Sequence, residues 1–377
     1  MQYGLRPGVL LAIVGVIVAA CTPAAARQAP PGSSGPVAAP ATNPPPAAAT
    51  AAATAPNPEG DLQTVRLGVL NIASDVTFYI AEERGYLREE GLQIETTRFD
   101  SAQRMTTPLG ADQLDAGAGA PGPGLYNAIQ RGISLRLIAD RGRAVPGANF
   151  NCLVVRKDLL DSGEVRTIAD LRGHVFAENV PGTITGYVLD KQLRQHGVSP
   201  DELTYVTMPF PEMLNGFANG AADATFLVEP FITIGTKRGL SECWKPTGEL
   251  DPNFQIALIL YGPEFAQARA DTARRFTVAF LRGVRDYYRA FFGDGEGREH
   301  ILELIAQHTA IKDPALLQSM SPTWMDPNGS LNVDSLRALQ HWYLERGDLT
   351  SEVDMDQVVD PSFVDYAVGR LGRYPTP

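Results

Sequence analysis

The fold expected for this chain follows from one stretch of sequence, VRLGVLNIASDVTFYIAEERG, residues 65–85. Its first six residues are mostly apolar or β-branched, as is typical of a buried strand. A turn follows at 71–75, where Ser74 or Asp75 can cap the helix expected over 76–84. Gly85 can then adopt the left-handed conformation that commonly ends a helix. The stretch therefore predicts a strand, a turn, a helix and a glycine stop.

The same unit recurs three more times. The copies are a strand at 115–120, turn at 121–124 and helix at 125–131 before Gly132; a strand at 174–178, turn at 179–183 and helix ending before Gly197; and a strand at 223–228, turn at 229–230 and helix ending before Gly239. Each of the four helices ends in Arg or His, which suits the negative end of the helix dipole. Further β-rich runs lie at 93–98, 135–139, 152–155, 203–207 and 256–260. This repetition predicts mostly parallel sheets covered by helices.

The sequence after Pro263 has a different period. Five of its apolar residues, spaced three or four apart, are Phe276, Phe280, Val284, Tyr288 and Phe291. That spacing predicts helices over the last hundred residues. The aromatic stripe is interpreted as core and not as a ligand site.

Composition narrows the class of protein. The chain has 377 residues, of which 44% are hydrophobic and 20% charged, so it can bury a sizeable core. At roughly 100 to 200 residues per domain it has room for about two domains. Lys and Arg number 32 against 43 Asp and Glu, a net charge of -11 without a basic run, which argues against nucleic-acid binding. Three cysteines are too few for a disulfide-built scaffold.

The N-terminus carries an export signal. Arg6 precedes an apolar run from Pro7 to Ala20, which is too short to span a bilayer comfortably and ends in Ala19-Ala20-Cys21. Val18 to Cys21 also looks like a bacterial lipobox. That resemblance implies a lipoprotein signal peptide over 1–20 and lipidation of Cys21. Ordinary export with cleavage near Ala20 is the alternative.

The region 21–61 is expected to be a disordered tether. Residues 22–60 include 14 Ala and 10 Pro, and only Arg27 and Glu59 are charged. Such a composition cannot bury enough apolar surface to fold. A processed propeptide is the alternative. In an oxidising compartment Cys152 and Cys243 could pair, or both could be buried free thiols.

The four turns are candidate ligand-binding segments. In open α/β sheets, ligands bind beyond the carboxyl ends of the strands, where helix N-termini present free N–H groups. Any single turn is explained by its capping residues alone, but four together favour a cleft. The sequence contains no HExxH, GxxxxGK[ST] or GxSxG motif, and its five His are scattered. We therefore expect no catalysis, no metal site and no cofactor.

Several short segments occur in an ordered series: YIAEERGYL at 79–87, EGL at 90–92, DAG at 115–117, LVVRKD at 153–158, IADLRG at 168–173, and GAADA at 220–224 followed by Glu229-Pro230. In this series the chain from Val65 to Tyr374 resembles the NMT1/THI5-like, sulfonate/nitrate/taurine-type substrate-binding proteins of bacterial ABC importers. The resemblance implies an α/β type II periplasmic-binding-protein fold, with two α/β lobes, a hinge and a helical C-terminal extension. Lobe I would comprise 62–155, lobe II 156–254, and 255–377 would form the return to lobe I and the C-terminal helices. The hinge runs would be 152–156 and 256–261.

Ligand-binding residues are assigned by their position in the turns and nearby. The candidates are Asn71, Ser74, Asp75, Gly119, Ala120, Arg141, Pro181, Gly182, Thr183, Thr185, Phe210 and Glu229. Thr183 and Thr185 could hold an anionic oxygen or cap the following helix. Arg141 and Arg143 could supply a positive partner or face solvent, and the second alternative is preferred. Phe78 and Tyr79 are candidate stacking residues that are preferred as core.

The charge of the ligand stays open. If Asp75 and Glu229 both face the cleft, a ligand with N–H donors, such as a pyrimidine or a flavin-type ring, fits better than a sulfonate. The lead hypothesis is the extracytoplasmic, lipid-anchored solute-binding component of an ABC importer, a monomer that captures a small polar solute such as a sulfonate, a nitrate-like ion or another organic anion. Its partners would be the permease and its ATPase. The alternatives are a binder of a vitamin precursor and a THI5-like enzyme that forms a pyrimidine.

Overall fold

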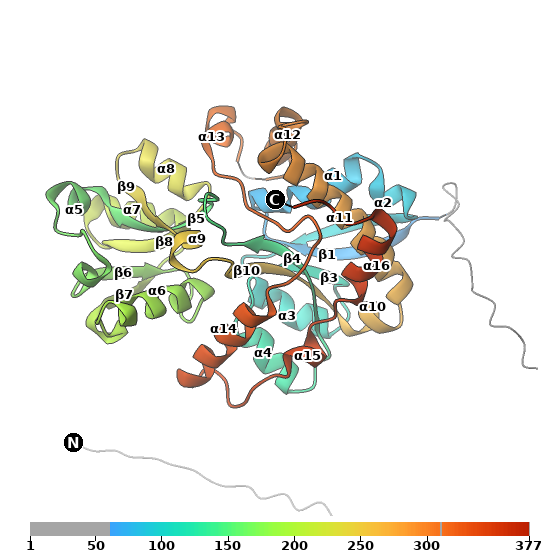
Figure 1. The fold of residues 1–377 in the computed structure, drawn as a ribbon, viewed down its shortest axis with the longest axis horizontal. Coiled ribbons are helices and arrows are strands. Elements are labelled where there is room, and N and C mark those ends of the chain that lie inside the picture. Colours follow the sequence, from blue (N-terminus) through green and yellow to red (C-terminus); the bar gives the residue numbers. More distant parts are fainter. Residues whose placement is uncertain (1–60, 310, 377) are drawn as a thin grey trace, which may run out of the picture. The chain divides into compact units, whose positions relative to one another are not determined.

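The computed structural model describes residues 61–309 and 311–376, which fall within one compact unit. The expected signal peptide, Cys21 and nearly all of the expected tether lie outside these residues. The described chain contains two five-stranded sheets with helices on their faces (Figure 1). We refer to each sheet with its helices as a lobe.

The first sheet has the strand order β2-β1-β3-β10-β4. Its strands are β1 (Gln63–Val69), β2 (Leu92–Arg98), β3 (Ala116–Gly119), β4 (Arg136–Arg143) and β10 (Gln255–Tyr261). β1 pairs in parallel with β2 and β3, whereas β10 is antiparallel to both β3 and β4. The helices that follow its early strands are η1 (Ala73–Asp75), α1 (Val76–Glu83), α2 (Tyr86–Glu89), α3 (Ala102–Gly110) and α4 (Pro123–Gln130).

The second sheet has the order β7-β6-β8-β5-β9. Its strands are β5 (Asn151–Arg156), β6 (Val175–Glu178), β7 (Thr204–Thr207), β8 (Ala224–Val228) and β9 (Ser241–Pro246). β6 is parallel to β7 and β8, and β5 is antiparallel to β8 and β9. The helices along this part of the chain are α5 (Lys157–Ser162), η2 (Ile168–Leu171), α6 (Ile184–Gln195), η3 (Pro200–Glu202), α7 (Phe210–Asn219), α8 (Phe231–Lys237) and α9 (Thr247–Leu250).

The strand pairing makes both sheets mixed and corrects one expectation. Four of the five strands in each sheet run in the same direction, as expected, whereas β10 in the first and β5 in the second run antiparallel to both of their neighbours. The expected hinge runs 152–156 and 256–261 are these same strands. Since β5 pairs only with strands of the second sheet, the boundary between the sheets precedes Asn151 and does not follow Val155.

The nine β-rich runs all form strands, and β9 is an additional strand that the sequence did not predict. The four repeated units also have the expected helices. Gly85, Gly132, Gly197 and Gly239 all have positive φ, between 66° and 90°, directly after a helix or one residue beyond it. The local sequence signals were therefore sufficient to locate these nine strands and the ends of these four helices.

The two connections between the sheets lie side by side. The backbone N–H of Ala144 donates to Phe254 O at 2.9 Å, and the N–H of Asn253 donates to Ala144 O at 2.7 Å. The hydroxyl of Thr247 donates to the side-chain oxygen of Asn151. The segments 144–150 and 247–254 therefore form the joint between the lobes.

The C-terminal region is helical, as expected. Its helices are α10 (Pro263–Gln267), α11 (Ala270–Phe292), α12 (Arg298–His308), α13 (Pro314–Ser319), α14 (Val333–Glu345), α15 (Met355–Val358) and α16 (Ser362–Leu371). α11 packs against α1 and α16 of the first lobe. By contrast α13 contacts α8, and α14 contacts both α4 and α6, so this region touches both lobes (Figure 1). Within the described ranges, no helix combines the length and the apolar character needed to cross a membrane.

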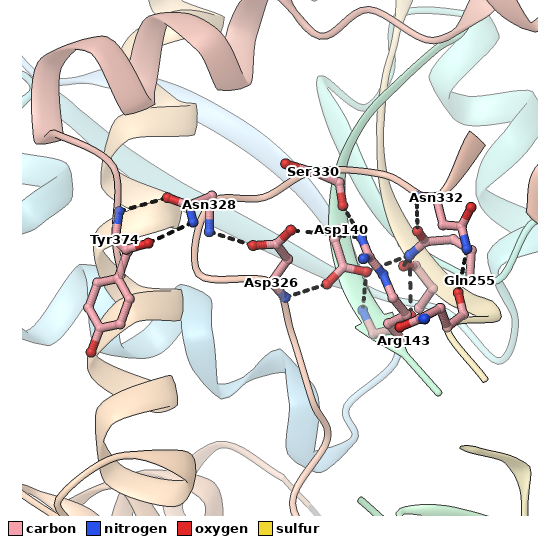
Figure 2. A network of polar contacts seen from close by, with 11 residues as sticks. Asp140, Arg143, Gln255, Asp326, Asn328, Ser330, Asn332 and Tyr374 are labelled. Atoms are coloured by element: carbon pink, nitrogen blue, oxygen red, sulfur yellow. Dashed lines mark hydrogen bonds and ion pairs between the residues drawn. The ribbon is translucent and has the colours of Figure 1, made fainter. Parts of the chain in front are cut away.

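A polar network fastens the long segment between α13 and α14 to the first sheet (Figure 2). The buried carboxylate of Asp140 accepts from the Gln255 side chain at 2.5 Å and from the N–H of Asp326 at 2.6 Å. Gln255 in turn accepts from the N–H of Asn332 at 2.9 Å. Burial raises the pKa of Asp140 to about 6, although Arg143 and the N–H donors oppose the rise. The network continues through Arg143, Asn328, Ser330 and Tyr374.

Cys152 and Cys243 form a disulfide between β5 and β9, with their Cα atoms 5.5 Å apart. The open alternative is thereby decided in favour of pairing. The bond closes a span of 91 residues within the second lobe.

Candidate functional site

A cavity of about 790 Å³ is lined by both lobes. The first lobe contributes residues at the ends of β1, β2 and β3, the starts of η1 and α3, and the turn after β3. The second lobe contributes the same ends of β6 and β8, the segment before α6, and the starts of α7 and α8. The segment Met320–Thr323 from the C-terminal region completes the wall. The cavity is therefore at the carboxyl ends of parallel strands, where the repeated turns were expected to meet.

Gly119 brings two elements of the first-lobe wall together. A Cβ atom at this position would lie 2.4 Å from the Cβ of Ala102, the first residue of α3. The absence of a side chain therefore lets the start of α3 pack against the end of β3. Gly119 acts in shaping the wall.

A buried ion pair lies on the first-lobe side. Asp75 is fully buried and its carboxylate accepts from the N–H of Leu70 at 3.2 Å and of Ile72 at 3.0 Å. The same carboxylate pairs with a terminal nitrogen of Arg141, which is 1% exposed. The Arg141 Nε has no hydrogen-bond partner in the described chain, although Arg141 lines the cavity. An unpaired buried N–H is costly, so the Arg141 side chain keeps one donor for which the described chain supplies no acceptor.

The start of α6 offers further donors on the second-lobe side. Thr183 is the residue before the helix, and its side chain makes no capping hydrogen bond. Its hydroxyl instead lies 3.0 Å from the hydroxyl of Thr185, and both residues line the cavity. The uncapped N-terminus of a twelve-residue helix attracts negative charge.

Glu229 occupies the start of α8. Its carboxylate accepts from the N–H of Thr233 at 3.1 Å and from the Thr233 hydroxyl at 2.8 Å. It also accepts from the N–H of Ser321 at 3.0 Å, which ties the second lobe to the C-terminal segment. Burial raises the pKa of Glu229, and these hydrogen bonds oppose the rise. The carboxylate thus neutralises its own helix end.

Aromatic side chains form much of the remaining wall. Phe210 and Phe231 are the first residues of α7 and α8, and their rings stack with centroids 5.8 Å apart. Both are half-buried and line the cavity. The other aromatic residues in the lining are Phe99, Phe150, Phe176, Phe226, Tyr287 and Phe291.

The structure brings eight of the twelve candidate residues to this cavity. They are Ser74, Gly119, Ala120, Arg141, Thr183, Thr185, Phe210 and Glu229. Asp75 lies behind Arg141. Asn71, in a left-handed turn conformation with φ of 59°, is not in the lining, and neither are the exposed Pro181 and the buried Gly182.

Two expectations about charge were wrong. Arg141 does not face solvent, because Asp75 draws it into the interior. The carboxylates of Asp75 and Glu229 are not free acceptors in the cleft, because each is already occupied by protein donors. The condition under which a ligand with N–H donors would fit better than a sulfonate is therefore not met. Phe78 and Tyr79 are buried, as preferred, whereas Phe291 of the aromatic stripe also reaches the cavity.

The sequence did not point to several lining residues. Among them are Phe99 and Gln103, which follow β2, and Phe176 and Phe226, which lie within strands. Phe99 and Gln103 could have been predicted, because they follow a β-rich run at 93–98 in the same way as the four turns follow their strands. Met320 to Thr323 carry no local signal, because they reach the cavity only through tertiary contacts.

The charged residues in the lining are three arginines and three acids: Arg98, Arg104, Arg141, Asp100, Glu178 and Glu229. Arg98 and Arg104 are exposed on the first-lobe side, while Glu178 is half-buried at the end of β6. Burial raises the pKa of Glu178. Within the described residues, no group of His, Cys, Asp and Glu side chains is arranged to hold a metal ion.

The two lobes and the cavity between them define a protein of the periplasmic-binding-protein class. Residues 74–290 match the family model described as NMT1/THI5 like, and the chain belongs to that family. The resemblance seen in the sequence is thereby confirmed.

Named relatives have similar sequences and folds. The "Putative aliphatic sulfonates-binding protein" of Bacillus subtilis (strain 168) is 23% identical over 316 residues, covering 81% of this chain and 89% of that protein. The periplasmic aliphatic sulphonate binding protein SsuA from Escherichia coli has a TM-score of 0.64 at 18% identity, covering 78% of this chain and 97% of the other. For the periplasmic nitrate-binding protein NrtA from Synechocystis PCC 6803 the TM-score is 0.66 at 14% identity, covering 83% and 90%. These structures confirm the expected periplasmic-binding-protein fold with two lobes.

Proposed function

We propose that this chain is the extracytoplasmic solute-binding component of an ABC import system of the sulfonate and nitrate type, and that its solute is a small anion. The observation that carries the proposal is the buried Arg141, which lines a cavity shared by both lobes and whose Nε has no partner in the described chain. The uncapped start of α6 adds donors from the opposite lobe. The named relatives, which are sulfonate- and nitrate-binding proteins, support the same solute type.

Capture would occur by rotation of the lobes about the paired segments 144–150 and 247–254. Two connections joined by backbone hydrogen bonds restrict such rotation to a hinge motion. Closing the cavity would exclude water, and each polar contact with the anion would become stronger in the less polar surroundings. The permease and its ATPase would receive the solute.

A thermal-shift screen tests the proposal. The panel comprises alkyl and aryl sulfonates, nitrate, aromatic carboxylates, pyrimidines and riboflavin. A solute present at a hundredfold excess over its Kd should stabilise the protein by about 2.7 kcal/mol. Stabilisation by anions alone is the expected result. Stabilisation by a pyrimidine or riboflavin alone would replace the proposal with the vitamin-precursor alternative.

The enzyme alternative has less support. It requires reactive His and Cys side chains gathered near a cofactor, whereas Cys152 and Cys243 are joined to each other. A visible absorption band from bound pyridoxal phosphate in the purified protein would favour the enzyme.

Lipid anchoring through Cys21 is part of the proposal. A Cys21→Ser variant should fold and bind the solute but leave the membrane fraction. Mass spectrometry of the membrane-bound protein should find a diacylglycerol group on Cys21, and retention of the Ser variant on membranes would contradict the anchor.

A further inference from the structure

The amide groups expected to bind an anion are unequally available, and this restricts where the ligand's charge can lie. The carboxylate of Asp75 takes the N–H groups of the first turn, and that of Glu229 takes the start of α8. Among the buried side-chain donors without a protein acceptor in the described ranges, the Arg141 Nε belongs to a residue of the cavity lining, and the exposed Arg98 and Arg104 add positive charge on the same side. Two sources of donors therefore remain, the arginine side of the first lobe and the uncapped start of α6, and only the first carries a full positive charge.

The charges around the cavity disfavour a second negative charge on the ligand. Its three arginines are balanced by three acids, and Arg141 is further paired with Asp75. Glu178 presents a half-buried carboxylate from the second lobe without a hydrogen bond to its side chain among the described residues. A second anionic group near Glu178 would meet like charge.

The remaining cavity wall is rich in aromatic and aliphatic side chains and favours a ligand with an apolar part. Phe210 and Phe231 present stacked rings from the second lobe, and Phe99 and Phe291 are half-buried in the first. Phe150, in the joint between the lobes, and Ile256, in β10, also line the cavity. A small inorganic ion would leave these surfaces against water, whereas an aromatic group would cover them and stack on the rings.

We infer that the cavity takes an aromatic organic monoanion, with its sulfonate or carboxylate group at Arg141 and its ring against Phe210 and Phe231. This inference rests on the proposed function and narrows its solute class. Inorganic oxyanions and short alkyl sulfonates are weak ligands, because they supply the charge without the apolar body.

Isothermal titration of the soluble chain from residue 22 with a matched series of probes tests the inference. The series is nitrate, methanesulfonate, benzenesulfonate, 2-naphthalenesulfonate, benzoate and 4-sulfobenzoate, with benzenesulfonamide as the neutral control. From methanesulfonate to 2-naphthalenesulfonate the affinity should rise at least about 100-fold, because a whole aromatic group becomes buried. The sulfonamide should bind at least about tenfold more weakly than benzenesulfonate, since it lacks the charge. The benzoate arm decides between carboxylate and sulfonate, and 4-sulfobenzoate should bind more weakly than both single anions.

Two variants test whether Phe210 and Arg141 cause the affinity differences within the probe series. Phe210→Ala should remove most of the gain between methanesulfonate and 2-naphthalenesulfonate, whereas Tyr366→Ala, an aromatic truncation outside the cavity, should leave it intact. Arg141→Lys keeps a charge beside Asp75 but loses Nε, and should weaken every anion about tenfold or more. If Arg141→Lys does not fold, the sulfonamide comparison still tests the charge.

The possible outcomes separate the inference from the proposed function. Binding of none of the probes would overturn both. Nitrate or methanesulfonate binding as tightly as 2-naphthalenesulfonate would overturn the inference and leave the function intact. A steep series that Phe210→Ala does not flatten would overturn the assigned position of the ring.

Discussion

The two lobes place a carboxylate at equivalent points, in a turn between a strand and a helix, with different results. Asp75 in the first lobe pairs with Arg141, so the turn holds a cation at the cavity. Glu229 in the second lobe has no cationic partner among the described residues and closes the start of α8 itself. The first lobe therefore supplies charge, while the second supplies aromatic surface and the start of α6. Whether a turn with a carboxylate holds a cation at the cavity therefore depends on which side chain lies beside that carboxylate in space.

The largest effect is expected from Arg141→Leu, which removes the cation from the first lobe. It would leave Asp75 buried without its partner, and loss of one member of a buried ion pair costs about 3–5 kcal/mol of unfolding free energy. Anion binding should be lost as well. Urea denaturation and titration calorimetry measure the two effects.

Two variants control that experiment. Arg131→Leu changes an exposed arginine at the end of α4 and should alter stability by less than about 0.5 kcal/mol. The double variant Asp75→Asn/Arg141→Gln should recover part of the stability without recovering binding. An Arg141→Leu protein of normal stability would show that the pair does not hold the first lobe together.

The second effect concerns a covalent difference between the lobes. The second lobe has the Cys152–Cys243 disulfide, and the strands and helices of the first contain no cysteine. Replacing both cysteines with Ser should reduce the unfolding free energy by about 2–4 kcal/mol, because the unfolded chain gains freedom over 91 residues. Because only the second lobe is weakened, calorimetry should resolve a separate transition of this lobe at a lower temperature than in the parent. A single unshifted transition would contradict the expectation.

The third effect concerns Asp140, which is adjacent to Arg141 in β4 but binds the C-terminal segment instead of Asp75. The pKa of Asp140 is raised to about 6 in the folded protein, so its contribution to stability is full below about pH 4 and is lost as the pH rises through 6. Asp140→Asn stays neutral, so the stability of the parent relative to this variant should fall by about 2–3 kcal/mol between pH 4 and pH 7. Urea denaturation across that range measures the difference. A constant difference would show that the Asp140 pKa is not raised.

The smallest effect is expected from Glu229→Gln, the counterpart of the Arg141 change. Gln keeps one carbonyl acceptor but loses the charge that strengthens the bonds to Thr233 and Ser321, so the unfolding free energy should fall by about 1–2 kcal/mol. Thr236→Val, an exposed change later in α8, is the control. Because Glu229 is not assigned to the ligand's charge, the affinity for anions should change far less than with Arg141→Leu. An equal loss would make Glu229 the principal ligand contact.

Much of the fold was predictable because its signals are local. Strand composition located nine strands, and the glycines after four helices mark conformations that other residues rarely adopt. The direction of β5 and β10 was not predictable in this way, because pairing is decided by partners distant in the chain. In the candidate site, the turns could also be predicted from local sequence. The burial of Arg141 could not, because it depends on Asp75, 66 residues away. The contact of Ser321 with Glu229 could not either, because it spans 92 residues.

A crystal structure of the protein with 4-bromobenzenesulfonate would show where the charged group and the ring of a bound ligand lie, since bromine can be located by its anomalous scattering. We expect the bromine peak beside Phe210 and Phe231, and a sulfonate oxygen within hydrogen-bond distance of the Arg141 Nε. A fully occupied ligand outside the cavity, or one whose sulfonate points away from Arg141, would contradict this expectation.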